Sequence, residues 1–236
     1  MERRTYLRSF GVASTVGIAG CLDSLSSGDG GEGDERERAD GAVLKPPETD
    51  LSEASHPSYG DELLDLSLPD PLNDETVSTT QFEGERAVLM TFIYTNCPDG
   101  MCPALTLRLR RTQEVAANDG YSDDIALLEM TFDPERDTED RLRTFADQQG
   151  VDVEAENWHF LRPETYDEAK QIMNEQIGLP LEKKDAEEYD SLEYVFPHYN
   201  LILLANADGI VERAYPNGAT IDPEAVIDDV ETVVSS

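Results

Sequence analysis

An apolar run followed closely by two cysteines constrains this chain more than any other stretch. Residues 87–94 are apolar on both faces, which is typical of a central strand covered on each side. The turn after the run holds Cys97 and Cys102, and Pro103 opens a segment with helical periodicity. We therefore expect two thiols at a helix N-terminus, where the helix dipole and free N–H groups favour thiolate.

The remainder of the folded region alternates strand and helix patterns. A short β-hairpin is expected over residues 63–82, and residues 179–195 lack periodicity and predict a long loop. Cysteines at the end of the first central strand have the placement found in thioredoxin-like proteins. We predict an α/β, thioredoxin-like fold with a central mixed sheet flanked by helices and an N-terminal β-hairpin. The expected helices cover 103–118, about 138–149, 164–177 and 222–234, and the later strands cover 125–132, 158–161, 201–205 and 210–215.

The first 21 residues are interpreted as a processing segment. Residues 3–8 carry a twin-arginine pattern, and the apolar stretch 10–19 is too short for a comfortable membrane span. Cys21 closes a sequence that resembles a lipobox, in which the cysteine is acylated. Residues 1–21 are thus predicted to be a twin-arginine lipoprotein signal. The mature protein would be anchored by lipidated Cys21 to the outer face of the cell membrane.

A Ser-, Gly- and acid-rich stretch follows the signal. Residues 22–62 contain almost no aromatic side chains and cannot bury enough apolar surface to offset their ordering entropy. They are predicted to form a disordered acidic linker, in which His56 is simply solvated. The folded domain is predicted to span residues 63–236.

The charge of the chain excludes several functions. Acidic residues outnumber basic ones 51 to 18, which gives a formal net charge of −33. Such a chain has no means of neutralising a run of phosphates, so nucleic acid is not expected as a partner, and neither is docking on anionic lipid. The acid is spread along the whole chain, which favours a protein adapted to very high salt, as in a halophilic archaeon. An acidic interaction protein is the alternative.

The two thiols that remain once Cys21 is lipidated admit more than one chemistry. Cys97 and Cys102 can form a disulfide if the turn brings them together, or they can chelate Cu(I) or Zn(II). His198 lies at the end of the long loop, just before a strand expected beside the cysteine strand, and one imidazole would complete a three-coordinate Cu(I) site. From the residues alone, a metal-binding His198 and an ordinary histidine are equally open. A structural disulfide is also open outside the cytoplasm, and His159 is expected to be structural.

Three separated segments carry a resemblance to a known family. The chain resembles the SCO/SenC family of thioredoxin-fold copper proteins, which help to assemble the binuclear copper centre of cytochrome c oxidase. The resemblance covers roughly residues 65–235 and implies that Cys97, Cys102 and His198 bind copper, Cu(I) or Cu(II). It also implies that loop 179–195 is a mobile flap that presents the histidine. The segments are residues 94–103 (Tyr-Thr-Asn-Cys-Pro-Asp-Gly-Met-Cys-Pro), residues 133–138 (Asp-Pro-Glu-Arg-Asp-Thr), and Tyr194 with His198 and Gly209.

The chain departs from the family pattern at two places. Four residues separate its cysteines where the family has three, which widens the turn. Pro197 stands where the family usually has an aspartate, so one acidic neighbour that would tune the imidazole is absent. Met101 adds a thioether inside the turn.

Two main functions follow. The first is an exported copper metallochaperone whose partner is the copper-binding subunit of a terminal oxidase. The second is a thiol-disulfide oxidoreductase, with Cys97 as the attacking thiolate and Cys102 as the resolving thiol, that keeps the copper-site cysteines of that oxidase reduced. A peroxidase ranks below both, because the only basic residues near the cysteines in sequence are arginines on the following helix. A non-catalytic lipoprotein with a structural disulfide is the fourth alternative.

Overall fold

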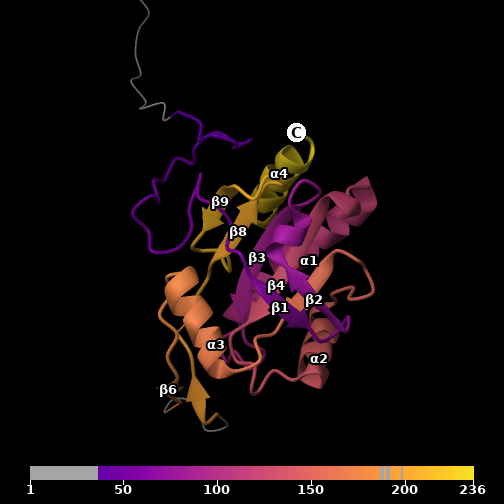
Figure 1. Cartoon of the computed structure of the whole chain (residues 1–236). Coiled ribbons are helices and arrows are strands. Elements are labelled where there is room, and N and C mark those ends of the chain that lie inside the picture. Colours follow the sequence, from indigo (N-terminus) through magenta and orange to yellow (C-terminus); the bar gives the residue numbers. More distant parts are fainter. Residues whose placement is uncertain (1–36, 187–188, 190–191, 198) are drawn as a thin grey trace, which may run out of the picture. The chain divides into compact units, whose positions relative to one another are not determined.

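The computed structural model describes residues 37–186, 189, 192–197 and 199–236, which belong to one compact unit of the chain (Figure 1). The predicted signal, including Cys21, lies outside the described residues. Within the described part of the chain, no helix combines the length and the apolar character that crossing a membrane requires.

A β-hairpin opens the regular structure, as predicted. Strand β1 (Ser67–Asp70) pairs antiparallel with β2 (Glu75–Ser78), and a 3-10 turn (Thr79–Phe82) follows directly. The inward residues Leu68 and Val77 are buried and face each other in the register, so the hairpin rests on the core by one face. The opposite face remains exposed.

Five strands form the central sheet. Their spatial order is β5-β4-β3-β8-β9, with β3, β4 and β5 parallel and β8 antiparallel to both of its neighbours. All seven residues of β3 and of β4 are buried, as expected for strands covered on both faces. The mixed sheet confirms the predicted fold class. The strands are β3 (Ala87–Ile93), β4 (Ile125–Thr131), β5 (Trp158–Leu161), β8 (Ile202–Ala205) and β9 (Val211–Tyr215).

The helices connect and cover these strands. Helix α1 (Met101–Asp119) joins β3 to β4 and packs against the sheet, against α2 (Glu139–Gln149) and against α4 (Pro223–Val234). Helix α1 begins two residues before the predicted start, and Gly120 ends it in the left-handed conformation. Helix α3 (Tyr166–Gln171) continues as one π-helical stretch, Ile172–Gln176, where regular α-helix was expected.

The segment 179–195 is only partly the irregular loop that the sequence indicates. It contains two short strands, β6 (Lys184–Asp185) and β7 (Tyr194–Val195), which pair antiparallel. Two-residue strands carry no readable alternation, so periodicity alone does not reveal them. Figure 1 shows β6 beyond the end of α3.

The structured part of the chain begins before residue 63. Glu212 of β9 is fully buried, and its carboxylate accepts hydrogen bonds from the backbone N–H groups of Val43 (2.6 Å) and Leu44 (2.9 Å). Leu44 itself is buried. The later part of the predicted linker is therefore attached to the domain. The hydrogen bonds to the buried Glu212 carboxylate and the burial of Leu44 hold it there, although most residues around Leu44 are polar.

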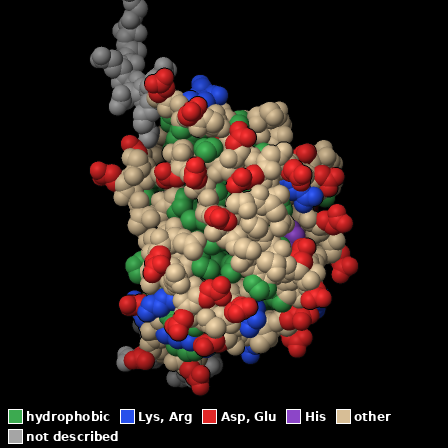
Figure 2. Space-filling model, in the orientation of Figure 1, with side chains coloured by type: hydrophobic (Ala, Val, Ile, Leu, Met, Phe, Trp, Pro, Cys, Tyr) green, Lys and Arg blue, Asp and Glu red, His purple; other side chains and the backbone are tan. Residues whose placement is uncertain are grey.

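The surface is acidic, as the composition implies. Figure 2 shows red carboxylate side chains scattered over the visible face, with few blue basic ones among them. This even distribution matches the spread of acid along the sequence.

Candidate dithiol site

The two cysteines meet in a tight turn between β3 and α1. Gly100 caps α1 with φ of 78°, a left-handed conformation that glycine adopts at least cost. The turn brings the N–H of Cys102 to 3.4 Å from Sγ of Cys97, so that the sulfur accepts a hydrogen bond. Cys97 is half-buried, Cys102 is buried, and both thiols are free. The extra residue in the turn is therefore accommodated without separating the cysteines.

The environments of the two thiols shift their pKa values in opposite directions. Hydrogen bonding by the Cys102 side chain lowers the pKa of Cys97, an effect that outweighs the opposing one of burial. Burial, followed by the proximity of Cys97, raises the pKa of Cys102 well above its ordinary value. Asp99 accepts a hydrogen bond from the Cys97 thiol (3.2 Å), which favours the neutral thiol and limits the lowering. Cys97 is thus the more acidic and more accessible sulfur.

Asp137 fixes the start of the turn. Its buried carboxylate accepts hydrogen bonds from the N–H and the hydroxyl of Thr95 and from the hydroxyl of Thr131. Burial raises the pKa of Asp137 to about 6 in spite of these three hydrogen bonds. Because Thr95 lies two residues before Cys97, the carboxylate ties the cysteine turn to the end of β4.

A second buried acid lies beneath the other side of the turn. Glu129 on β4 has no exposed surface, and burial raises its pKa to about 8. Thr106 donates to Oε1 of Glu129 (2.5 Å) and also lies 3.1 Å from the carbonyl oxygen of Cys102. Oε2 of Glu129 has no hydrogen-bond partner among the described residues. Glu129 cannot be recognised from the sequence, because an acid within an apolar strand gives no sign of its contacts.

The third predicted ligand, His198, lies outside the described residues. Its described chain neighbours are placed on both sides of it. The ring of Phe196 packs edge-on against Tyr94 at 5.2 Å, and Leu201 accepts a hydrogen bond from Thr91 on β3 (2.8 Å). The chain before and after position 198 therefore contacts the carboxyl-terminal half of β3 and the residue that follows it, close to the cysteine turn.

The β6–β7 ribbon is held to the segment 133–138. The hydroxyl of Tyr194 donates to Asp133 at 2.9 Å, and the Arg136 guanidinium stacks 4.0 Å from the centre of the Tyr194 ring. Lys183 forms an ion pair with Glu135 (2.8 Å) and lies 4.5 Å from the same ring. Burial raises the pKa of Tyr194, and the hydrogen bond to Asp133 adds to that rise. Two of the motif segments are thus joined directly; mobility of the flap stays a prediction.

The arginines on α1 that a peroxidase would need are Arg108, Arg110 and Arg111. The guanidinium of Arg108 donates to the carbonyl oxygen of Ile221, Arg110 pairs with Glu114, and Arg111 pairs with Glu114 and Glu224. They do not provide the basic pocket that a peroxidatic cysteine needs.

His56, in the predicted linker, has its ring nitrogen Nδ1 2.9 Å from the carbonyl oxygen of Pro57.

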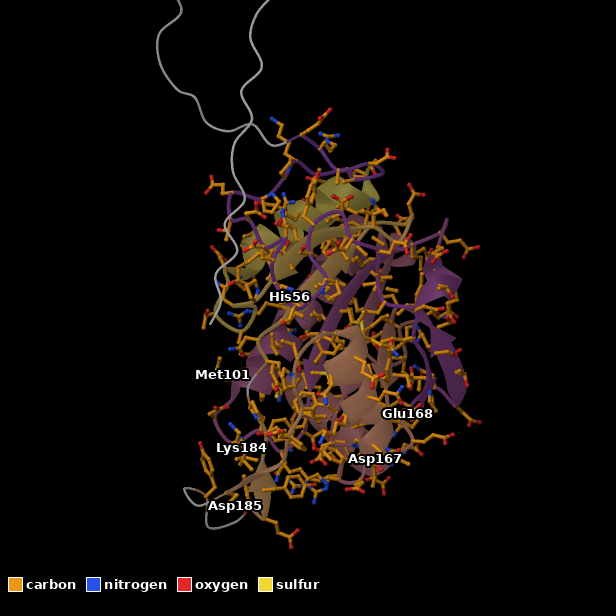
Figure 3. All side chains as sticks on the ribbon, turned by 60° about the vertical axis from the view of Figure 1, so that its left-hand side comes forward. His56, Met101, Asp167, Glu168, Lys184 and Asp185 are labelled. Atoms are coloured by element: carbon orange, nitrogen blue, oxygen red, sulfur yellow. The ribbon has the colours of Figure 1, made fainter. Side chains whose placement is uncertain are left out.

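The donor set of the turn suits a soft metal ion. Two adjacent thiols, one of lowered pKa, supply thiolate sulfur, which Cu(I) and Zn(II) prefer. Met101 begins α1 half-buried, and Figure 3 shows its side chain at the edge of the molecule. The same figure places Lys184 and Asp185 of β6 further along that edge. The described residues therefore define a thioredoxin-like protein with a dithiol at a helix N-terminus.

Comparisons with known proteins place this arrangement in a family. A sequence model of the SCO1/SenC family matches residues 71–235, and the chain belongs to this family. Comparison with curated proteins finds no match.

Solved structures share the fold. BsSco, a member of the Sco family of cytochrome c oxidase assembly proteins with a disulfide switch, is 23% identical and superposes with a TM-score of 0.58 over 76% of this chain and 96% of its own. Copper-bound ScoI from Bradyrhizobium japonicum is 20% identical, with a TM-score of 0.55 over 73% of this chain and 99% of its own. Copper-bound yeast Sco1 is 20% identical, with a TM-score of 0.56 over 76% and 90%.

Proposed function

We propose that this protein binds a copper ion, Cu(I) or Cu(II), as cargo through Cys97, Cys102 and His198, and delivers it to the copper-binding subunit of a cytochrome oxidase. The meeting of two free thiols at the N-terminus of α1 is the observation that carries the proposal. Family membership and the copper-bound relatives support it. The contacts of Phe196 and Leu201 support His198 as the third ligand, because they bring its chain neighbours to the cysteine strand.

The first residues support a location outside the cytoplasm. In this proposal the twin-arginine signal exports the folded domain, and lipidated Cys21 holds it at the outer face of the membrane. The net charge of −33 and the scattered surface carboxylates support operation in high salt, which screens their mutual repulsion.

Copper stoichiometry tests the ligand set. The reduced protein in molar salt is expected to retain one copper per chain after gel filtration. Cys97→Ser and His198→Ala are expected to lose it, whereas His56→Ala, which removes an imidazole from the predicted linker, is the matched control and keeps it. Retention of copper with unchanged affinity in His198→Ala would contradict the proposed site.

A second function is favoured by the unequal thiols. Cys97 is accessible with a lowered pKa, and Cys102 is buried with a raised one, as a nucleophile and a resolving thiol require. The Cys97 thiolate would attack a disulfide of the oxidase copper site and form a mixed disulfide, releasing one target thiolate. Cys102 would then attack Cys97 as it loses its proton, which releases the second target thiol and leaves a Cys97–Cys102 disulfide.

Trapping distinguishes the two functions. If the protein is a reductant, Cys102→Ser should accumulate a mixed disulfide with an oxidised peptide that carries the two copper-site cysteines. The wild-type protein should reduce the peptide with equal consumption of its own dithiol. Failure of both reactions, with copper binding intact, would leave the metallochaperone alone.

A further inference from the structure

Three metal-ligating side chains converge away from the cysteine turn. Asp70 ends β1, Glu75 begins β2 and His159 lies within β5; together they are called the hairpin cluster below. Nδ1 of His159 lies 3.1 Å from Oδ2 of Asp70 and 3.3 Å from Oε1 of Glu75. One donor atom from each of the three residues lies within 4.8 Å of the others. The cluster therefore joins two strands of the hairpin to the edge of the central sheet.

Two members of the cluster are rigidly held. Asp70 has no exposed surface, and the side chain of His159 is 7% exposed. The N–H of Leu72 donates to Oδ1 of Asp70, and the side chain of Asn73 donates to Oδ2 (2.8 Å). Such outer hydrogen bonds orient a carboxylate before an ion arrives. Glu75, with 47% of its side chain exposed, is free to adjust.

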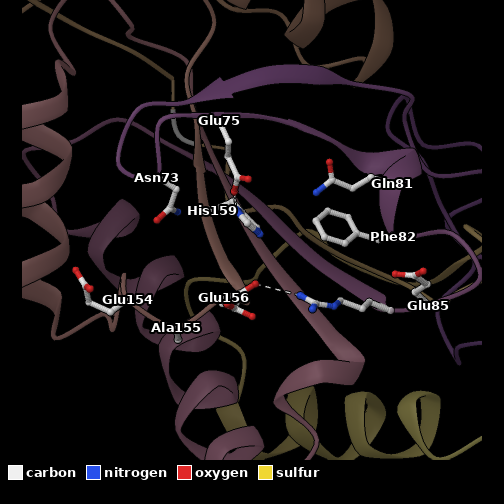
Figure 4. A pocket seen from close by; sticks show the side chains of 10 residues that line it. Asn73, Glu75, Gln81, Phe82, Glu85, Glu154, Ala155, Glu156 and His159 are labelled. Carbon is white, nitrogen blue, oxygen red and sulfur yellow. Dashed lines mark hydrogen bonds and ion pairs between the residues drawn. The ribbon is translucent and has the colours of Figure 1, made fainter.

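His159 joins the cluster through Nδ1, and its side chain is more than nine-tenths buried. The ring lines a cavity of about 470 Å³, and Figure 4 shows Glu75 and His159 meeting at its wall. A ring that keeps its hydrogen on Nε2 can donate it to water in this cavity. Nδ1 then offers its lone pair to a metal ion between the two carboxylates.

Two of the three donor spacings fit a coordination shell, and the spacing between the oxygens of Asp70 and Glu75 is limited to 4.8 Å. Bonds of about 2.0–2.2 Å from a divalent ion to nitrogen and oxygen ligands place neighbouring donors roughly 3–3.5 Å apart. The two distances from Nδ1, 3.1 and 3.3 Å, fall in this range. A hydrogen on Nδ1 would be shared between two anionic oxygens, whereas a cation satisfies all three donors together.

The surroundings favour a cation with bound water. Several carboxylates line the cavity, together with the cation Arg86. The guanidinium of Arg86 donates a hydrogen bond to the carbonyl oxygen of Glu156 (3.0 Å). One imidazole with two carboxylates is a donor set for borderline divalent ions, and water in the cavity would complete the shell. The additional carboxylates are Glu85, Glu154 and Glu156.

We propose that Asp70, Glu75 and His159 bind one divalent first-row transition-metal ion, separately from the dithiol. By joining the hairpin to β5, the ion would stabilise the folded state by an amount that grows with the logarithm of the free ion concentration above the dissociation constant. The cluster is independent of the function of the dithiol, whose residues follow β3 and do not lie on the strands of the cluster.

Zinc titration of the full chain tests the site. All three cysteines are replaced by serine so that sulfur does not capture the ion, and excess Mg²⁺ in molar salt suppresses diffuse binding to surface carboxylates. Calorimetry should then show one zinc per chain. Glu75→Gln should weaken binding by at least about tenfold. Glu85→Gln is the matched control, since it removes an exposed carboxylate from the same cavity but none of the three donors.

Several outcomes would overturn the proposal. They are the absence of stoichiometric zinc binding, or an equal loss of affinity in Glu75→Gln and Glu85→Gln. His159→Gln provides a second check: it should abolish binding, and its circular dichroism shows whether the fold survives. Because Glu75 is exposed, its variant reports on the site even if the histidine variant does not fold.

Discussion

The dithiol site and the hairpin cluster each contain a fully buried aspartate that accepts hydrogen bonds from the turn beside it. Asp137 receives its donors from Thr95 and Thr131, and so links the segments that follow β3 and β4. Asp70 accepts hydrogen bonds from Leu72 and Asn73 of its own turn and lies 3.1 Å from Nδ1 of His159, and so links the hairpin to the edge strand. The first aspartate positions a site at the centre of the sheet, and the second positions one at its edge.

The two regions differ in where their donor atoms come from. Cys97 and Cys102 are close in sequence, so the turn itself brings them together, whereas His159 is far along the chain from Asp70 and Glu75. The dithiol region also contains an acid that is not fully compensated, Glu129.

Replacing Glu129 is expected to have the largest effect. The folded-state pKa of about 8 lies above the ordinary value of 4.5, so folding takes up a proton between these two pH values. The stability that this provides is present below pH 4.5 and is lost as the pH rises toward 8. Glu129→Leu should remove this loss, which amounts to at most about 5 kcal/mol. Denaturant unfolding at a series of pH values measures it.

The same experiment separates Glu129 from Asp137. Asp137 also has a raised pKa, of about 6, so it contributes to the loss of stability mainly at lower pH. The loss of stability that Glu129→Leu removes should extend up to about pH 8. An unchanged pH profile in this variant would show that water or a partner compensates the buried carboxylate.

Removing the two aspartates tests the comparison directly. Asp137→Ala leaves three donors unsatisfied and Asp70→Ala leaves two, so they should lower the free energy of unfolding by about 3 and about 2 kcal/mol, respectively. Their effects on the thiols should differ. Alkylation of buried Cys102, followed by mass spectrometry, should become faster in Asp137→Ala because the turn loosens, and it should stay unchanged in Asp70→Ala. Equal acceleration in both would mean that the regions are coupled.

Much of the fold can be predicted from the sequence because its signals are local. The fully apolar runs of β3 and β4 and the glycine stops at Gly120 and Gly150 lie within single elements. The hairpin and the mixed sheet follow from the order of these elements. The ordered segment around Leu44 does not, because it depends on Glu212, which is far along the chain and reads as an ordinary polar residue of a strand.

The sites show the same division. Cys97 and Cys102 can be predicted as a pair, since their spacing and the following helix place them together. His159, which the sequence suggests is structural, acquires its neighbours only through the docking of the hairpin on β5. Glu129 is hidden for a similar reason: its partner, Thr106, is on the helix that covers its strand. Contacts between side chains of different elements produce no periodicity or motif spacing in the sequence, so they cannot be predicted from it.

The smallest expected effects come from one left-handed residue in each region. Gly100 in the cysteine turn has φ of 78°, and Asp74 in the hairpin turn has φ of 54°. A Cβ added at Gly100 meets nothing within 4 Å, so Gly100→Ala should cost only the backbone strain, about 1 kcal/mol. Asp74→Gly should gain about 0.5 kcal/mol, because it removes that strain while the unfolded chain becomes more flexible.

Measured by denaturant unfolding, the two changes should have opposite signs. Opposite signs would show that both turns require a left-handed residue. Glycine meets this requirement without strain in the cysteine turn, whereas Asp74 is strained in the hairpin turn. The same sign in both would mean that Asp74 is held by contacts whose loss outweighs the relief of strain. The hairpin turn would then be positioned as firmly as the cysteine turn, which would strengthen the case that Asp70 and Glu75 are arranged before an ion binds.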